Sequence, residues 1–234
     1  ILNEKKIKNC FIKKFYPDQI DEQNILEKNG KLFKNKKRLN SLLQANLEGY
    51  KVAIFDDGLQ DNSIDYDLKI VCFNNTNWIG NGFTIPSGPL RENVENIKKY
   101  KNVFLNGNDE DLDEIKKFIS KIDTNINIYQ GKYIPKNIDE FNTNDKFLVF
   151  SGIGNHKTFI SMLKNNKLNI VKDIEFPDHY SYSENDINEI ISISNKLDCR
   201  IITTEKDYLR LKKDDLDKIK YIKVDLEILN ENKF

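Results

Sequence analysis

The stretch that decides the fold is Val52-Ala53-Ile54-Phe55-Asp56-Asp57-Gly58-Leu59-Gln60-Asp61, in which a short apolar run leads into two adjacent carboxylates and a glycine. An apolar run that ends at a turn signal predicts a buried strand, of the kind found in parallel sheets. Ligands of open α/β sheets bind outside the carboxyl ends of the strands, so Asp56 and Asp57 are predicted to lie where a site forms. Two carboxylates there suit Mg²⁺ shared with nucleotide phosphates; the alternative is that Asp-Asp-Gly simply makes a turn.

The segments around this stretch alternate between strand and helix patterns. A strand is predicted over Cys10-Phe11-Ile12, and residues 38–47 carry four leucines at helical spacing ahead of Gly49. Further strands are predicted over residues 67–73 and 102–107. This order predicts an α/β fold.

The regular pattern breaks between Asn125 and Asp145, where only short extended pieces remain. A second α/β unit then begins with the strand pattern of residues 146–150, and a last strand is predicted from Tyr221 to Leu226. We therefore predict a domain boundary at the break. The predicted parts are a first domain over residues 1–125, a linker over 126–144, a second domain over 145–220, and a returning strand and C-terminus over 221–234.

The composition narrows the possible function classes. Lys+Arg and Asp+Glu each number 37, and this balance argues against a general nucleic-acid binder. No apolar run approaches the ~20 residues that cross a bilayer. The three widely spaced cysteines, Cys10, Cys72 and Cys199, predict reduced, buried thiols rather than disulfides or a zinc site.

Two further positions carry possible chemistry. Asp178-His179 is the one His/carboxylate pairing in the sequence that looks catalytic, because histidine titrates near neutral pH; a solvated turn histidine is the alternative. Arg91 stands near the start of a helix predicted to run to about Lys99, where it could hold a phosphate beside backbone amides. Its alternative is a surface salt bridge with a neighbouring glutamate.

Six unusual segments stand in a fixed order, and together they resemble tetraacyldisaccharide 4′-kinase, the lipid A 4′-kinase family of Gram-negative bacteria. The resemblance runs from about Phe11 to Leu226. The segments are Asp56-Asp57-Gly58-Leu59-Gln60, Gly80-Asn81-Gly82, Pro86-Ser87-Gly88-Pro89-Leu90-Arg91-Glu92, Ser151-Gly152-Ile153-Gly154-Asn155, Phe176-Pro177-Asp178-His179-Tyr180 and Thr204-Glu205-Lys206-Asp207.

The resemblance implies a Mg²⁺-requiring transfer of the γ-phosphate of ATP to the 4′-hydroxyl of a tetraacylated glucosamine disaccharide 1-phosphate. It implies a peripheral protein at the cytoplasmic face of the inner membrane, with no nucleic-acid partner. It also implies two α/β/α sandwich domains, the first a P-loop kinase-like domain, joined by a two-stranded linker.

The resemblance also implies roles for individual residues. Asp56 and Asp57 match a Walker-B-like pair that would hold Mg²⁺ or its waters, and Gln60 of the same motif is assigned with them to the nucleotide site. Arg91 matches an active-site arginine that would contact phosphate. His179 matches a histidine that orients an aspartate acting as catalytic base across the domain cleft. The best match for that aspartate is Asp21, although Ile20 replaces the family's glycine before it and helix capping is its alternative role. Tyr16 and Arg38 match positions near the substrates.

Two features depart from the family pattern. The family usually has histidine after the Asp-Asp-Gly-(Phe/Leu)-Gln run, where this chain has Asp61. The glycine-rich phosphate loop ending in Gly-Lys-Thr and the N-terminal membrane-associating helix, which should precede Phe11, are not in the sequence. Since the first residue is Ile1 rather than Met, we expect an N-terminally truncated family member, which without that loop would bind nucleotide poorly and turn over negligibly.

Two other functions fit the same residues. A metal-dependent phosphohydrolase could use the same carboxylate pair, and it would release phosphate without ATP. A non-catalytic binding module would need no phosphate loop at all. A Gly-rich loop encoded upstream of Ile1 would favour the kinase.

Overall fold

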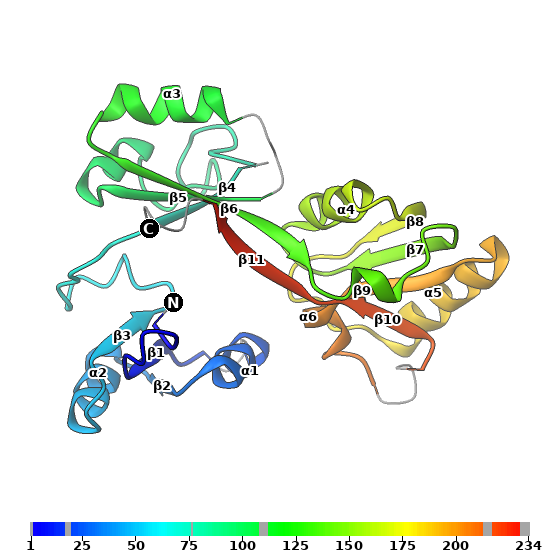
Figure 1. Cartoon of the computed structure of the whole chain (residues 1–234), viewed down its shortest axis with the longest axis horizontal. Coiled ribbons are helices and arrows are strands. Elements are labelled where there is room, and N and C mark those ends of the chain that lie inside the picture. The colour runs from blue at the N-terminus through cyan, green and yellow to red at the C-terminus, as the bar shows by residue number, and fades with distance from the viewer. Residues whose placement is uncertain (1, 17–19, 76, 108–111, 213–216, 230–234) are drawn as a thin grey trace. The chain divides into compact units, whose positions relative to one another are not determined.

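The computed structural model describes residues 2–16, 20–75, 77–107, 112–212 and 217–229, with the backbone alone for residues 20 and 21 (Figure 1). The chain divides into two compact units, Ile1–Lys69 and Ile70–Phe234, which are described separately. Both units are α/β with parallel strand pairs, as predicted. The domain boundary predicted at the break between Asn125 and Asp145, with a linker over residues 126–144, stays a prediction.

The first unit is a three-stranded parallel sheet whose order is β2-β1-β3. Its strands are β1 (Asn9–Lys14), β2 (Leu32–Asn35) and β3 (Val52–Phe55), connected through α1 (Ile20–Asn29) and α2 (Arg38–Leu47). The strands predicted over residues 10–12 and 52–55 and the helix over 38–47 are confirmed. In the parallel register Ile12 lies opposite Phe55, so β1 and β3 end side by side.

Leu42 of α2 packs against the core of the unit, but the other three leucines of the helix do not. Leu39, Leu43 and Leu47 are exposed, and Leu47 is 87% exposed, whereas Ala45 packs with Cys10, Ile12 and Phe33 in the core of the unit. Helical spacing of apolar residues therefore predicted the helix correctly, although most of its leucines do not pack on this sheet.

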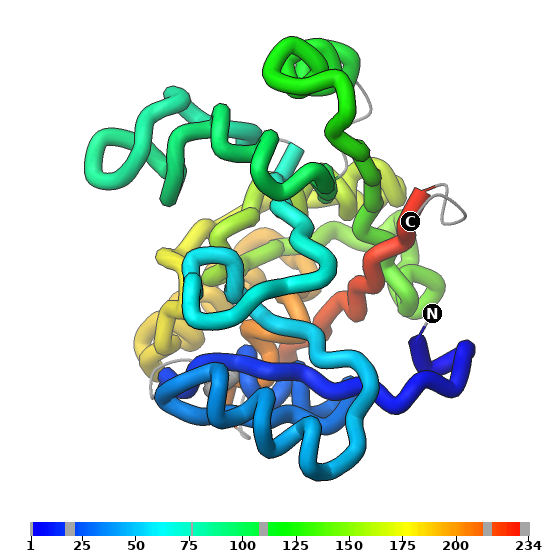
Figure 2. The backbone as a smooth tube through the Cα atoms, turned by 90° about the vertical axis from the view of Figure 1, so that its left-hand side faces the viewer, coloured from blue at the N-terminus to red at the C-terminus, as the bar shows by residue number. Residues whose placement is uncertain are grey.

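The second unit contains two four-stranded sheets. The first has the order β11-β6-β5-β4, and its strands are β4 (Val71–Asn74), β5 (Asn102–Asn106), β6 (Asn127–Pro135) and β11 (Val224–Leu229). β11 pairs antiparallel with β6 in a ribbon visible in both views (Figure 1 and Figure 2). α3 (Asp113–Ile122) packs Ile119 into the core of this sheet, and the helix predicted after Arg91 is a 3₁₀ helix, η1 (Val94–Lys99).

The other sheet is parallel and has the order β10-β9-β7-β8. Its strands are β7 (Lys146–Ser151), β8 (Asn169–Glu175), β9 (Arg200–Thr204) and β10 (Ile219–Ile222), and its helices are α4 (His156–Asn165), α5 (Glu184–Leu197) and α6 (Glu205–Tyr208), with the 3₁₀ helix η2 (Ile138–Glu140) ahead of β7. The last strand predicted over residues 221–226 is in fact divided between β10 and β11, which belong to different sheets.

Alternation along β7 places helices on both faces of this sheet. Phe147 and Val149 pack with Phe159 of α4, whereas Leu148 and Phe150 pack in a second cluster with Ile187 and Ile190 of α5. Successive strand side chains point to opposite faces, so a run that is apolar at every position predicts a strand covered on both sides.

The three cysteines are free thiols, but they are not all buried. Cys10 is buried and Cys199 is half-buried, whereas Cys72 is exposed. The prediction of burial is therefore wrong for Cys72, which lies on β4, an edge strand of its sheet. No helix in the described residues is long and apolar enough to cross a bilayer.

Candidate functional site

Asp56 and Asp57 follow β3 directly, as the sequence predicts. The backbone N–H of Asp56 donates to the carbonyl of Ile12 (3.0 Å), which extends the parallel ladder to the strand end, and Asp57 turns the chain with a left-handed φ of 54°. A Cβ at Gly58 would lie 3.0 Å from both Phe55 Cβ and Tyr66 Oη. The tight turn therefore needs glycine, and it fixes where the two carboxylates leave the sheet.

Lys13 is a member of this site that the sequence did not reveal as functional. Its ammonium donates to Asp56 Oδ2 and to Glu22 Oε2 (2.7 Å), and its side chain is only 4% exposed. Burial alone would lower the pKa of Lys13, but the hydrogen bonds to the two carboxylates outweigh it and raise that pKa. The parallel register that sets Ile12 against Phe55 is the signal that could have placed Lys13 beside Asp56.

Arg38 donates hydrogen bonds to the backbone of the same turn. Its Nη2 donates to the carbonyl of Asp57 (2.6 Å) and to that of Asp56 (3.4 Å), and Nη1 lies 3.6 Å from Asp61 Oδ2. Hydrogen bonds from Ser63, with the Arg38 charge contributing less, lower the pKa of Asp61. Asp61, at the position where the family usually has histidine, thus forms part of the scaffold that carries the carboxylates.

The donor set fits a magnesium ion of the kind shared with phosphates. Within the described residues no group of three His, Cys, Asp or Glu side chains is arranged to hold a metal. Mg²⁺ usually needs only one or two protein carboxylates, with waters and substrate phosphate oxygens as its other ligands. Asp56 and Asp57 match that requirement, and the Lys13 ammonium offsets part of the charge of Asp56.

His179 lies in a second group of polar side chains, in the second unit. It follows β8 in a turn with a left-handed φ of 59°, and its N–H donates to the carbonyl of Gly152 (3.1 Å). Its Nε2 lies 3.9 Å from Asp178 Oδ2, and its Nδ1 lies 3.4 Å from Nη2 of Arg210. Both ring nitrogens therefore face charged side chains.

Asp207 is the buried centre of this group. It is 0% exposed, and its Oδ1 accepts hydrogen bonds from the Gly152 N–H (3.1 Å), the Tyr182 hydroxyl (2.9 Å) and Arg210 Nη1 (3.1 Å). Its Oδ2 accepts from the Thr204 hydroxyl (2.6 Å). The last residue of the Thr204-Glu205-Lys206-Asp207 segment thus ties the glycine loop after β7 to the arginine that contacts His179.

The pH dependence of this centre can be tested at Tyr182. Burial, and next the neighbouring Asp207 carboxylate, raise the pKa of Tyr182 well above its ordinary value. A raised pKa in the folded state stabilises the protein fully below the ordinary tyrosine value of ~10 and less as the pH rises above it. Tyr182→Phe should therefore cost about 1–2 kcal/mol of unfolding free energy at pH 7, and urea titrations should show this difference narrowing above about pH 10. Tyr16→Phe, at an exposed tyrosine, is the matched control. A difference that stays constant to pH 11 would contradict the assignment.

The structure shows a second His/carboxylate pairing, which the sequence did not reveal, and the prediction that Asp178-His179 is the pairing with a catalytic role stays a prediction. His156 Nδ1 lies 2.7 Å from Ser151 Oγ, and His156 Nε2 lies 3.4 Å from Asp173 Oδ2. Ser151 and His156 are both buried, which gives a substrate no route to this serine. The trio braces the start of α4 and was missed because its members come from three separate elements.

The remaining predicted site residues whose side chains are described lie on the surface of the protein. Arg91 is exposed, two residues before the Asn93 cap of η1, and the carboxylate of Glu92 accepts hydrogen bonds from Asn96 and Tyr100. Gln60 is exposed in the turn after Gly58, and Tyr16 is exposed after β1. The side chain of Asp21 lies outside the described part of the structure. Asp56, Asp57, Gln60 and Asp21 belong to the first unit, and Arg91 and His179 belong to the second.

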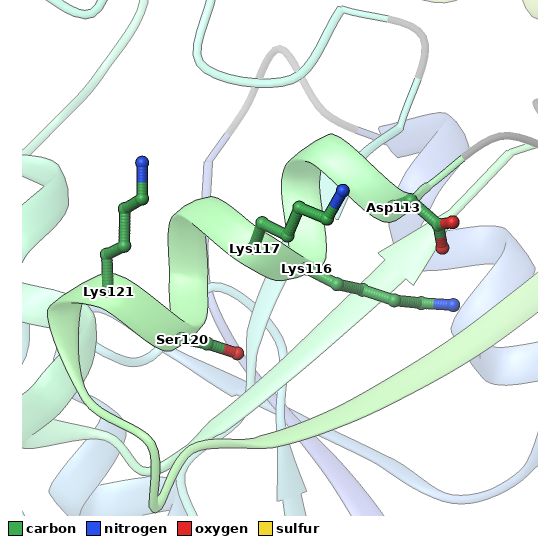
Figure 3. Close-up of a pocket in the computed structure, with 5 residues that line it drawn as sticks. All are labelled: Asp113, Lys116, Lys117, Ser120 and Lys121. Atoms are coloured by element: carbon green, nitrogen blue, oxygen red, sulfur yellow. The ribbon is translucent and has the colours of Figure 1, made fainter.

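A shallow pocket on α3 contains none of these residues. It is lined by Asp113, Lys116, Lys117, Ser120 and Lys121 (Figure 3). Figure 3 shows the lysine side chains extending from the helix in different directions rather than converging on one point. This surface is a basic, solvated helix face, and it forms no part of the candidate site.

Comparison with known proteins identifies the family. Residues 21–234 match the family model for tetraacyldisaccharide-1-P 4′-kinase. The chain belongs to the tetraacyldisaccharide 4′-kinase family. It is 62% identical to the tetraacyldisaccharide 4′-kinase of Pelagibacter ubique over 231 residues, which are 99% of this chain and 74% of that protein. The family member from Rickettsia bellii is 34% identical over 91% of this chain and 64% of its own length.

The family's fold is also found in a solved structure. The crystal structure of LpxK from Aquifex aeolicus in complex with ATP matches 98% of this chain and 78% of that chain, with a TM-score of 0.64 and 20% sequence identity. This likeness establishes an α/β fold with parallel sheets like that of the 4′-kinase from Aquifex.

Proposed function

We propose that the protein carrying this chain is an ATP-dependent tetraacyldisaccharide 4′-kinase of lipid A biosynthesis. Its reaction transfers the γ-phosphate of ATP to the 4′-hydroxyl of a tetraacylated glucosamine disaccharide 1-phosphate. The observation that carries this proposal is the match of residues 21–234 to the family, together with the 62% identity to the Pelagibacter ubique kinase. Two adjacent carboxylates at the end of a parallel strand support it, because phosphoryl transfer needs a divalent cation held beside the phosphates.

The domain plan of the proposed enzyme has two α/β/α domains. Residues 1–125 would be part of a P-loop kinase-like domain, and residues 145–220 would form the second domain. The pairing of β11 with β6 from Gln130 to Pro135 supports a two-stranded linker in residues 126–144 and 221–234.

At the phosphates, the residues of the β3 turn would do the binding. Asp56 and Asp57 would hold Mg²⁺, which when bound neutralises charge that develops on the transferred phosphoryl group. Gln60 would contribute to the nucleotide site, and Arg91 would contact a phosphate, since its planar guanidinium can bind two phosphate oxygens at once. Arg38 and Lys13 would keep the turn and the Asp56 carboxylate in place.

For the acceptor hydroxyl, we assign Asp21 as the general base and His179 as the residue that orients it. In an in-line transfer, the base accepts the 4′-hydroxyl proton while positioning supplies most of the rate. His179 suits the orienting role because its backbone is fixed by Gly152 and its ring by charged neighbours.

Replacing His179 tests that assignment. In the full-length protein, His179→Ala should lower kcat by about 10²-fold, since positioned acid–base groups contribute ~10²–10⁴-fold. Steady-state phosphorylation of the lipid acceptor is the measurement, and Asp21→Ala should lower kcat at least as much. His156→Gln replaces the chain's other histidine and should leave kcat within about threefold. A His179→Ala enzyme within about threefold of wild type would refute the role.

A labelled-phosphate experiment separates the kinase from its rivals. With γ-labelled ATP and tetraacyldisaccharide 1-phosphate, the kinase transfers label to the lipid. When ATP is omitted, the kinase releases no inorganic phosphate from the lipid. A phosphohydrolase releases phosphate from the substrate without ATP, and a binding module does neither. Either of the last two results, in full-length protein, would overturn the proposal.

The substrate also suggests where the enzyme works. A tetraacylated acceptor stays in the bilayer, so we propose that the protein acts peripherally at the cytoplasmic face of the inner membrane. Flotation of full-length protein with acceptor-containing vesicles should recover it in the lipid fraction.

A further inference from the structure

We infer that Arg210 is a positioning residue that selects one tautomer of His179, the neutral imidazole with its proton on Nε2. The juxtaposition that carries this inference is a row of four side chains: Asp178, His179, Arg210 and Asp207. Nε2 of His179 faces Asp178 Oδ2 at 3.9 Å, Nδ1 faces Arg210 Nη2 at 3.4 Å, and Arg210 Nη1 lies 3.1 Å from Asp207 Oδ1. The inference rests on the proposed function for its catalytic consequence.

Arg210 is held in place from the side opposite the histidine. Its side chain is 13% exposed and pairs with Asp207, whose side chain is 0% exposed. Nη1 also donates to the carbonyl of Gly152 (3.1 Å), the same carbonyl that accepts the N–H of His179. The guanidinium and the histidine are thus fixed to a common point, and the arginine cannot turn away without breaking a buried ion pair.

The chemistry of arginine decides the tautomer. A guanidinium carries five N–H donors, has no acceptor and stays charged in proteins. The ring nitrogen that faces it can therefore only accept, so Nδ1 must carry a lone pair and the proton of the neutral ring must be on Nε2. The Asp178 carboxylate favours the same arrangement, because it attracts an N–H on the Nε2 side.

The backbone around His179 also favours this orientation of the imidazole ring. His179 adopts a left-handed φ of 59°, an uncommon conformation for a residue with a side chain. A Cβ on Gly154 would come 3.3 Å from Asp178 Oδ2, so the glycine loop leaves room for that carboxylate. The strained turn presents the ring with Nδ1 toward the protein's buried ion pair and Nε2 toward Asp178.

This tautomer matters for the proposed reaction. Because Arg210 occupies Nδ1, the Nε2–H is the group through which His179 would donate to a carboxylate under the proposed function. The wrong tautomer leaves a lone pair facing a carboxylate, which repels instead of orienting it. Arg210 would then act through His179 and touch no substrate.

Nitrogen NMR of the histidine rings tests the inference directly. The chain has two histidines, so a long-range ¹H–¹⁵N spectrum of the ¹⁵N-histidine chain, at a pH where the rings are neutral, shows two ring patterns, and His179→Gln identifies one of them. We expect a pyridine-type shift at Nδ1 and a pyrrole-type shift at Nε2 of His179. A pyrrole-type Nδ1 in the wild-type chain would overturn the inference without any variant.

Variants of Arg210 then test its role. Arg210→Met should mix the two tautomers of His179, and Arg210→Lys, which keeps a donor-only cation, should restore much of the wild-type pattern. Arg200→Met is the matched control, because Arg200 pairs with Asp145 at 3.1 Å and is 68% exposed. Unchanged His179 ring shifts in a folded Arg210→Met chain would contradict the inference; if that variant does not fold, the Arg210→Lys and wild-type spectra decide.

Turnover separates this inference from the proposed function. In the full-length kinase, Arg210→Met should lower kcat by about 10-fold with the KM for the lipid within about twofold, and Arg210→Lys should recover most of the loss. If His179→Ala abolishes turnover while Arg210→Met does not change it, the inference fails and the kinase stands. If the tautomer is as expected but the wild-type enzyme transfers no phosphate, the proposed function fails.

Discussion

Replacing Asp207 with alanine is expected to lower the free energy of unfolding by about 3–5 kcal/mol, the typical cost of breaking a buried ion pair from one side. The carboxylate is 0% exposed and accepts from Gly152, Tyr182, Thr204 and Arg210. Without it, the buried Arg210 guanidinium has lost its carboxylate, and the Gly152 amide has lost its acceptor. Urea unfolding followed by far-UV circular dichroism measures the change.

Asp225 provides the matched control for this substitution. Its carboxylate lies 3.3 Å from Lys136 Nζ, with both side chains more than half exposed. Exposed pairs contribute ~0–1 kcal/mol, so Asp225→Ala should change stability by less than about 1 kcal/mol. If the two variants cost the same, Asp207 is not the buried centre described above.

Removing either carboxylate of the β3 turn should nearly abolish phosphoryl transfer. Charge stabilisation by a bound divalent cation contributes several kcal/mol, and each 1.4 kcal/mol is tenfold in rate, so Asp56→Ala or Asp57→Ala should lower kcat about 10³-fold in the full-length enzyme. Phosphorylated lipid formed across a Mg²⁺ titration is the measurement. A shift to higher Mg²⁺ requirement should accompany the loss.

Asp65→Asn is the control for general effects of charge in the same unit. Asp65 is 99% exposed and lies 3.5 Å from Lys69 Nζ, away from the β3 turn in the hydrogen-bond network. The Asp65→Asn substitution should leave turnover and Mg²⁺ dependence unchanged. Asp56→Ala and Asp57→Ala enzymes that both keep wild-type turnover would show that the carboxylate pair only shapes the turn.

Much of the fold could be predicted because local patterns agree with it. The helix at residues 38–47 and the strand at 52–55 lie at their predicted bounds, since spacing and a following glycine mark them clearly. Which leucines of α2 pack could not be predicted, because the neighbouring strands set this. The division of residues 219–229 into two strands was equally invisible, since β10 and β11 differ in partner and not in composition.

The parts of the site that are continuous in the sequence could be predicted. The parts that strand pairing and helix packing bring together could not. Asp56 and Asp57 follow a strand and could be found from that alone. The roles of Lys13 and Arg38 depend on which strand lies beside β3 and on which helix side faces the turn. Asp207 was recognisable as part of a motif, but its complete burial depends on contacts with the loop after β7, which no local pattern reports.

The β6–β11 ribbon has a consequence for synthesis of the chain. β6 leaves the ribosome long before β11, whose residues pair with it from Gln130–Leu229 to Pro135–Val224. Until β11 emerges, one side of β6 from Gln130 to Pro135 presents unpaired N–H and C=O groups, the kind of edge that recruits other chains. A nascent chain stalled before Val224 therefore carries an open sheet edge that β11 covers once it is made.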